Sequence, residues 1–292
     1  MTESALAVRA ARPVDARGAS WRAIYIIWYR DVLRYWRDRW RLMASLAQPL
    51  LFLIVFGTGL SSSLRGATGS FGGSGAGSVQ YVQFIYPGIV AMAVLFTSMF
   101  SAMSIVWDRE FGFLKEVLVA PINRAAVAVG KTLGGTTQAL VQGLVLLVLA
   151  PFVGVRLNAL SVLELLPLIA VLAFALSAMG VAVASRMRSM QSFGVVMNFL
   201  MMPIFFLSGA LFPLNGLPGW MTVLTRLDPA TYGVDPIRQV VLAGSGVPSS
   251  LLQRFGVTVF DRTLTPPAEV ALLAAFGIAM LAIAIANFRQ RE

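Results

Sequence analysis

Gly130-Lys131-Thr132 is the tripeptide whose residue types suit phosphate binding. A phosphate-binding loop of the form GxxxxGK[ST] ends in these residues, and its backbone N–H groups and lysine contact the phosphates of a nucleotide. The first glycine of that pattern should stand at position 125, which is Ala125, and an apolar run begins directly after Thr132. We therefore expect no nucleotide site here, and Lys131 more simply marks the cytosolic end of an apolar segment.

Few other groups in the chain suit catalysis or metal binding. The sequence has no cysteine and no histidine. Their absence removes disulfides, thiolate chemistry, and the commonest general base and metal ligand. We predict no catalytic residue and no metal site.

Trp107–Arg124 is a highly charged stretch between two long apolar segments. Five of its first ten residues are charged: Asp108, Arg109, Glu110, Lys115 and Glu116. Each charge at the centre of a spanning helix costs about 2.5–3.5 kcal/mol, whereas a leucine or phenylalanine favours insertion by only about 0.3–0.6 kcal/mol. The stretch therefore lies outside the hydrocarbon, and the chain is a membrane protein.

Most of the remaining chain consists of apolar runs of membrane-spanning length. Hydrophobic residues make up 58% and charged residues 12%, whereas a soluble domain has about 25% charged residues. A helix needs about 20 apolar residues to cross a hydrocarbon core about 30 Å thick. Six segments qualify: Leu42–Leu60, Phe84–Val106, Leu133–Val153, Val162–Ala184, Phe193–Phe212 and Val270–Phe288. We predict an all-α membrane protein with a six-span transmembrane domain over residues 42–292.

The residues before the first span predict a helix in the membrane interface. Residues 1–19 have no periodic apolar face and predict a disordered cytosolic tail. Over residues 20–41, two sets of side chains fall on opposite helical faces: Trp21, Trp28 and Trp36 on one, and Arg30, Arg34 and Arg37 on the other. Aromatic residues opposite arginine are typical of an interfacial helix whose arginines contact anionic headgroups. An ordinary amphipathic helix packed on protein is the alternative.

Basic residues are distributed unevenly between the two sides of the predicted membrane domain. With the N-terminus inside, 17 of the 23 lysines and arginines lie on the inner side and 6 on the outer side. Cytoplasmic segments carry such an excess, so we expect both termini in the cytoplasm, with the chain in the inner or plasma membrane of a bacterium. The asymmetry also accounts for the net charge of +10 without nucleic acid as a partner.

The last outer segment, residues 213–267, is the longest piece outside the predicted spans. Pro218, Pro229 and Pro236 suit first-turn positions of helices. We predict two short helices, roughly Pro218–Leu227 and Pro229–Leu242. They lie on the outer surface or are partly re-entrant where they pack on protein.

Four residues in the third and fifth spans are candidates for a substrate path. Gln138 and Gln142 share one helix face, and Asn198 and Met201 lie within the fifth span. Polar groups inside a membrane usually face the bundle interior, and methionine adapts to varied apolar surfaces. The polar residues either join helices by hydrogen bonds or line a path for cargo, and the methionine either fills the core or contacts cargo.

The charged stretch itself predicts a short amphipathic helix over residues 108–120. Phe111 and Leu114 lie on one side, Asp108 and Glu110 fall in the first turn, and Pro121 ends the helix. Such a helix is either an interfacial loop helix or a docking element for a soluble partner.

YPGIVAMAVLF opens the second span and is followed by DREFGFLKEVLVAPINRAAVAVGK. Together they resemble the signature region of the type-2 ABC exporter permeases, in which PG opens the second span and DRE-x-G-x-x-x-x-L-x-x-x-P forms the cytosolic coupling segment. QPLLFLIVFG and SGALFPLNGLPGWMTVLTRLDPATYGVDPIRQ are similar to further blocks of that family. The resemblance covers most of residues 20–245, and the daunorubicin-resistance-like multidrug exporters are the most similar group.

The resemblance implies two membrane subunits that work with two ATP-binding subunits, which hold ATP and magnesium. This chain itself would bind no cofactor. A coupling helix over residues 108–120 would contact the ATPase, and its expected residues are Asp108, Arg109, Glu110, Phe111, Gly112, Lys115, Glu116 and Pro121. Phe113 departs from the pattern, because a small or β-branched residue is common at that place.

We therefore expect the membrane subunit of an ATP-driven exporter of hydrophobic or amphipathic compounds, such as drugs or lipids, that assembles as a homodimer. The partners would be an ATP-binding subunit, the lipid bilayer and the apolar cargo. Two alternatives stay open. One is the same architecture exporting a polysaccharide or a lipid-linked glycan, and the other is a membrane scaffold or regulator that transports nothing.

Overall fold

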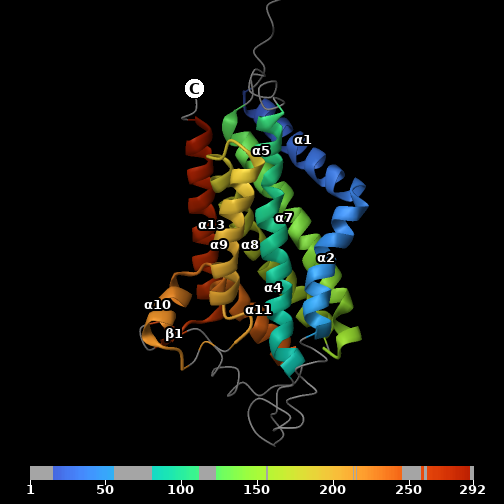
Figure 1. The fold of residues 1–292 in the computed structure, drawn as a ribbon, viewed down its shortest axis with the longest axis vertical. Helices are drawn as coiled ribbons and strands as arrows, with labels where there is room; N and C mark the ends of the chain where they lie inside the picture. The colour runs from blue at the N-terminus through green and yellow to red at the C-terminus, as the bar shows by residue number, and fades with distance from the viewer. Residues whose placement is uncertain are drawn as a thin grey trace, which may run out of the picture.

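The computed structural model describes residues 16–55, 81–111, 123–155, 157–212, 214, 216–244, 258–259 and 262–289. Most of its helices run along one long axis (Figure 1). The elements are α1 (Ala16–Arg37), α2 (Arg39–Ile54), α4 (Tyr81–Ser101), α5 (Met103–Glu110), α7 (Arg124–Leu149), the 3-10 helix η2 (Ala150–Val153), α8 (Ala159–Ala184), α9 (Met190–Leu207), α10 (Gly219–Leu227), α11 (Thr231–Gly244), β1 (Thr258–Val259), β2 (Arg262–Thr263) and α13 (Pro266–Arg289). The all-α class is confirmed, apart from the two-residue strands β1 and β2, in which Val259 pairs with Arg262.

Five helical segments of the described chain are long and apolar enough to cross a membrane. They are Val82–Glu110, Arg124–Val153, Ala159–Ala184, Met190–Leu207 and Pro266–Arg289, and they correspond to the predicted second to sixth spans. The predicted first span is helical from its start as far as Ile54. Its last residues, 56–60, lie outside the described residues.

The N-terminal helix begins and ends earlier than predicted. α1 starts at Ala16 and ends at Arg37, and α2 starts at Arg39. Residues 39–41 therefore belong to the first membrane-directed helix and not to the predicted interfacial one. Residues 37–41 include four charged side chains, which need water or headgroups around them, so the chain changes direction at Asp38. The predicted tail, as far as residue 15, lies outside the described residues.

Polar side chains fix the first turns of three helices. At the start of α7, Asn123 accepts a 3.0 Å hydrogen bond from the backbone N–H of Ala125. Asn158 and Ser189 accept equivalent bonds at the starts of α8 and α9, of 2.6 Å and 3.2 Å. An N-cap oxygen of this kind satisfies a backbone donor that has no partner within the helix. The caps of α7 and α9 also fix those helix starts beside the end of α5.

α8 is the central helix and packs against α4, α7, α11 and α13. Its side chains are almost all buried from Leu172 to Ala184. Small residues allow close packing around it: a Cβ added to Gly135 of α7 would lie 2.2 Å from Oγ of Ser101 in α4 and 2.8 Å from Oγ of Ser177 in α8. α1 packs on α7, α2 on α4, and α9 on α4 and α5.

The two ends of the bundle differ in what they carry. α5 and the C-terminal end of α13 lie at one end, which we call the inner end, and α10, α11 and the hairpin lie at the other, the outer end (Figure 1). α10 and α11 confirm the two short helices predicted before the last span. Pro218 is the N-cap of α10, and Pro229 precedes α11, whereas Pro236 lies inside α11.

Candidate coupling site at the inner end of the bundle

Asp108, Arg109 and Glu110 form the last turn of α5. The prediction that Asp108 and Glu110 lie in the first turn of a separate helix is wrong, because the second span continues through them. α5 follows α4 after an interruption of one residue, Ala102, and Phe111 caps its end. The other predicted coupling residues lie outside the described residues: Gly112, Lys115, Glu116 and Pro121.

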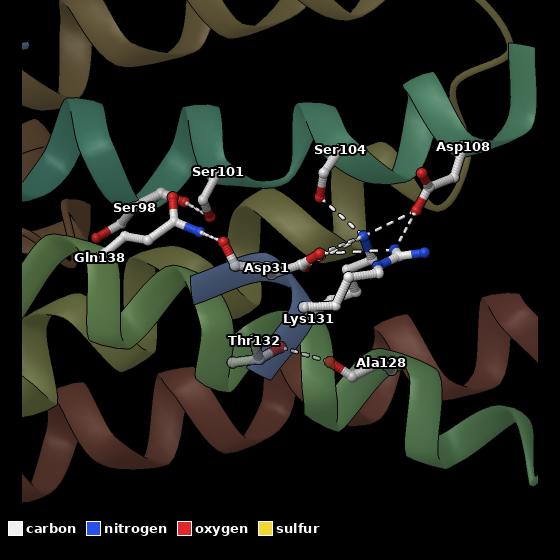
Figure 2. A network of polar contacts seen from close by, with 10 residues as sticks. Asp31, Ser98, Ser101, Ser104, Asp108, Ala128, Lys131, Thr132 and Gln138 are labelled. Carbon is white, nitrogen blue, oxygen red and sulfur yellow. Dashed lines mark hydrogen bonds and ion pairs between the residues drawn. The ribbon is translucent and has the colours of Figure 1, made fainter. Parts of the chain in front are cut away.

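Asp108 points into the bundle, where two cations meet it. Its Oδ2 lies 2.7 Å from Nη2 of Arg30 in α1 and 2.9 Å from Nζ of Lys131 in α7. The Lys131 side chain is only 4% exposed and also lies 3.1 Å from Oδ2 of Asp31. Lys131 donates a further hydrogen bond of 3.0 Å to Ser104. Figure 2 shows the side chains of Asp31, Ser104 and Asp108 directed toward that of Lys131.

These four charged residues, Arg30, Asp31, Asp108 and Lys131, form what we call the inner ion cluster. It has two positive and two negative charges, and Arg30 also lies 3.5 Å from Asp31. A buried charge is costly unless it is paired and hydrogen-bonded. Moving α5 away from α7 would leave buried charges without partners, so α1, α5 and α7 are constrained to move together.

Arg109 is hydrogen-bonded to the backbone at the end of α8. Its guanidinium donates to three backbone carbonyl oxygens: Ser185 at 3.1 Å, Ala184 at 3.5 Å, and Met187. The last carbonyls of a helix have no partner within the helix and carry the negative end of its dipole. The cation therefore suits this position in both charge and hydrogen bonding.

Glu110 is hydrogen-bonded to the backbone at the start of α9. Its Oε2 accepts a 2.9 Å hydrogen bond from the backbone N–H of Met190, the first residue of that helix. An anion suits the positive end of a helix dipole. Three consecutive residues thus contact four different helices: Asp108 contacts α1 and α7, Arg109 the end of α8, and Glu110 the start of α9.

The last helix, α13, is hydrogen-bonded to the residues that follow α8. Arg186, just after α8, donates to Oδ1 of Asn287 in α13 at 3.1 Å and 3.2 Å. The amide of Asn287 donates to Oγ of Ser185 at 2.9 Å. The turn that Arg109 holds is therefore also attached to α13.

Lys131 and Asp31 are functional candidates that the local sequence pattern missed. The interpretation of Lys131 as a marker of the span end overlooked its partner, which lies 100 residues earlier in the chain. A signal was present in the spacing of the buried residues of α1. Every fourth residue from Ala23 through Ile27 to Tyr35 is buried, and Asp31 belongs to this row. An acid in a buried row requires a buried partner.

The glycine before Lys131 belongs to a helix and to no loop. Gly130 lies within α7, where a Cβ would approach Ile27 of α1 to 3.0 Å. Thr132 donates its hydroxyl to the carbonyl of Ala128 at 2.9 Å. A phosphate-binding loop needs free backbone N–H groups, whereas Gly130, Lys131 and Thr132 lie inside the helix α7.

The two glutamines of α7 bind α1 and α2. Gln138 donates to the backbone oxygen of Asp31 at 3.4 Å. Oε1 of Gln142 accepts from Tyr35 at 3.3 Å and from Oγ of Ser45 at 3.1 Å, and its amide donates to the Ser45 carbonyl at 3.0 Å. The amide groups that we proposed for a substrate path are thus used in contacts between helices.

A groove of about 180 Å³ lies between α4 and the N-terminal helices α1 and α2. Its lining is mostly apolar and aromatic: Tyr35, Ser45, Gln48, Pro49, Met92, Ala93, Phe96, Thr97 and Phe100. Of the other predicted path residues, Met201 is buried in α9 and Asn198 is exposed on it. Neither is among the residues that line this groove.

The predicted interface residues of α1 divide between the surface and the bundle. Trp21 and Trp36 are 73% and 55% exposed. Trp28 turns to the bundle and donates a 2.9 Å hydrogen bond to α7. The Arg34 guanidinium stacks over Trp107 of α5 at 5.2 Å from the ring centroid, so α1 contacts α5 through its arginines as well as through the inner ion cluster.

Together, the fold and the inner site define a multi-pass membrane protein whose helices are joined through one charged turn. Residues 22–242 match the model of the family described as ABC-2 type transporter. The match covers well over half of the chain, so the chain belongs to the ABC-2 type transporter family. It is a membrane subunit of an ABC transporter, and the family implies an ATP-binding partner subunit.

Several relatives are similar over most of their length. The transport permease ycf38 of Cyanophora paradoxa is 29% identical over 213 residues, which are 72% of this chain and 71% of the relative. Nodulation protein J of Rhizobium meliloti (strain 1021) is 27% identical over 226 residues, 77% of this chain and 80% of the relative. The inner membrane transport permease YadH of Escherichia coli (strain K12) is 25% identical over 245 residues, 82% of this chain and 90% of the relative.

Proposed function

We propose that this permease exports hydrophobic or amphipathic compounds, such as drugs or lipids, from a bacterial cell, and that a separate subunit hydrolyses the ATP. The observation that carries the proposal is the turn Asp108–Glu110, whose three side chains contact α7, the end of α8 and the start of α9. The residues that follow this turn are the coupling segment on which the ATP-binding subunit acts. A displacement of this segment would therefore be transmitted to α7, α8 and α9 together.

The groove between α4 and α2 supports an apolar or amphipathic cargo. Its polar groups are few, mainly Ser45, Gln48 and Thr97, among aromatic and aliphatic side chains. Apolar pockets with a few polar groups suit such compounds. A glycan presents many hydroxyl groups, which would need far more hydrogen-bonding partners than this groove offers.

The inner end of the bundle is the cytoplasmic end in this proposal. The excess of basic residues on that side supports the orientation. Arg30, Arg34 and Arg37 line one open hollow of α1, where anionic headgroups of the inner leaflet would be attracted. The exposed tryptophans of α1 suit the same interface.

The second membrane subunit is a copy of this chain and contacts α9 in this proposal. Asn198 is exposed on a face of α9 that is otherwise apolar, with Val195, Phe199 and Met202 exposed beside it. Polar residues within spans face protein or water-filled cavities in preference to lipid. A second copy, with the transport path between the two, would cover Asn198.

Replacing Arg109 tests the coupling role. The complex with the ATP-binding subunit is reconstituted in liposomes, and ATP-dependent transport of a fluorescent apolar dye and of a fluorescent phospholipid is measured. We expect Arg109→Ala to reduce transport about tenfold or more while the ATP-binding subunit still binds, because a charge-assisted hydrogen bond contributes about 1.5–3 kcal/mol. The control is Arg188→Ala, at an exposed arginine of the turn between α8 and α9 that Arg109 contacts.

Three outcomes would contradict the proposal. Equal transport by the Arg109→Ala and wild-type complexes would remove the coupling role. Transport of a lipid-linked glycan, with none of the dye or the phospholipid, would favour the glycan exporter. Stable assembly with the ATP-binding subunit but no transport of any of these compounds would favour a scaffold or regulator.

A further inference from the structure

Two carboxyl groups meet inside the outer end of the bundle, far from the inner ion cluster. Glu269 lies in the first turn of α13 and Asp235 lies in α11, and their carboxyl groups are close enough to interact electrostatically. Glu269 is 0% exposed and Asp235 is 1% exposed. The two helices pack against each other, so this contact is part of the attachment of α11 to the last span.

The Glu269 carboxyl receives no hydrogen bond from an N–H or hydroxyl group of the described residues. Two ionised carboxylates offer only acceptors, so they can be hydrogen-bonded to each other only when one of them carries a proton. Two carboxyl groups that share a buried site also repel each other when both are ionised. Burying two neighbouring carboxyl groups, one of them without any hydrogen-bond donor, therefore favours a state in which the pair holds one proton.

Arg238 is a buried cation one turn after Asp235 in α11, and it interacts electrostatically with Asp235. It is 0% exposed, donates to the carbonyls of Gly209 and Ala210, and stacks over Phe84 at 4.3 Å from the ring centroid. Its Nε and Nη1 have no partner among the described residues. One arginine, two carboxyl groups and one proton make a neutral buried group, whereas without the proton a net negative charge would be buried.

Few other ionisable groups face Glu269 from the described helices around α13. Tyr232 of α11 is close enough to interact electrostatically with Glu269 and Asp228. α8 has one ionisable residue, Glu164, which is exposed, and α7 and α13 carry theirs, apart from Glu269, toward the inner end. The dipole of α13 favours an anion at its start, but this effect is small beside the cost of burying an uncompensated carboxylate.

We propose that Asp235 and Glu269 form a proton-binding site, which holds one proton while α11 is packed on α13 and releases it when the two helices separate. The ligand is a proton and not a metal ion, because no group of three acidic residues within the described chain is arranged to hold a metal. The proposal does not depend on the cargo or on the direction of transport. It links the outer end of the permease to the pH of the outer compartment.

The test is infrared difference spectroscopy of the full chain in lipid nanodiscs. We expect a carbonyl-stretch band of a protonated carboxylic acid at neutral pH, which shifts in D2O and is lost at alkaline pH. In the Asp228→Asn background, which removes the band of that buried acid, Glu269→Gln and Asp235→Asn should each remove the remaining band, because the proton needs both groups. Glu164→Gln, at the exposed glutamate of α8, should leave the band unchanged. The separate contribution of Asp228, a buried acid nearby, is identified with Asp228→Asn.

Several results would overturn the proposal. A band that survives Asp235→Asn would place the proton on Glu269 alone, and a band that survives Glu269→Gln would place it elsewhere. Loss of the band on adding sodium chloride at constant pH would indicate a cation site. If either variant does not fold, titration of the Asp228→Asn variant decides: absence of the band at neutral pH contradicts the shared proton.

Discussion

Lys131 is enclosed by Asp31 and Asp108, and Arg30 contacts both carboxylates from α1. We predict that Lys131→Met destabilises the chain by about 3–5 kcal/mol, because removing one partner leaves an uncompensated buried charge. Thermal unfolding in detergent measures the loss.

A compensating variant separates charge from packing at the same place. Lys131→Met combined with Asp31→Asn leaves Arg30 paired with Asp108, so most of the lost stability should return. Equal destabilisation in the single and double variants would mean that the lysine contributes through its packing and not through its charge.

Asp228 predicts a pH dependence at the outer end. Burial raises the pKa of Asp228 from its ordinary value of 3.8 to about 8, although its hydrogen bond from Ala230 lowers it somewhat. Because the folded pKa lies above the unfolded one, this contribution to stability is complete below about pH 4 and is lost as the pH rises through about 8. Unfolding midpoints measured across this range should fall less for Asp228→Asn than for the wild type.

Asparagine is the suitable replacement because its side-chain oxygen can still accept from the N–H of Ala230, as the Asp228 carboxylate does at 2.9 Å. The difference between the two pH curves therefore reports the ionisation and not the loss of the cap. Parallel curves would show that Asp228 stays ionised in the folded chain.

The helices α4, α7 and α8 approach one another closely at Gly135. A methyl group there would meet the hydroxyl of Ser101, which is already directed to the carbonyl of Ser98 at 2.6 Å. We predict that Gly135→Ala destabilises the chain by about 1–3 kcal/mol, the usual cost of overpacking. Thermal unfolding in detergent is the measurement.

Gly194→Ala provides the matched control, because it also replaces a helical glycine but has open space around the added Cβ. Alanine favours a helix over glycine by about 0.5–1 kcal/mol, so this variant should be neutral or slightly more stable. Similar losses in both variants would mean that close packing at Gly135 does not matter.

The helices were more predictable from sequence than the contacts between them. Apolar length was enough to locate the second to sixth spans, and prolines were enough to locate α10 and α11. The end of α5 was mispredicted because charge was taken as the sign of a new helix, whereas Asp108 is compensated by residues from α1 and α7. A local pattern contains no information about partners that lie 78 or 100 residues away.

For the whole molecule, the exposed face of α9 predicts where a second copy binds. The chain has no cysteine, so a single introduced cysteine reports its own surroundings. Phe199 is 79% exposed on α9, and Ile278 is 62% exposed on α13. We predict that Phe199→Cys forms a covalent dimer on oxidation in membranes, because a disulfide requires close approach of the two Cβ atoms.

Ile278→Cys, on a face that we expect to contact lipid, should remain monomeric under the same conditions. Cross-linking of both variants to the same extent would indicate random collision, and cross-linking of Ile278→Cys alone would place the subunit contact on α13. Either result would remove α9 from the proposed dimer.

The Asp31–Lys131 pair has a consequence for how the chain is made. When the ribosome has synthesised α1, the lysine that neutralises Asp31 is still 100 residues from synthesis. Until Lys131 has been synthesised, Asp31 has no buried cation to pair with, so α1 remains at the membrane surface. Its final position requires the second and third spans to be inserted first, which makes docking of the first helix a late event in biogenesis.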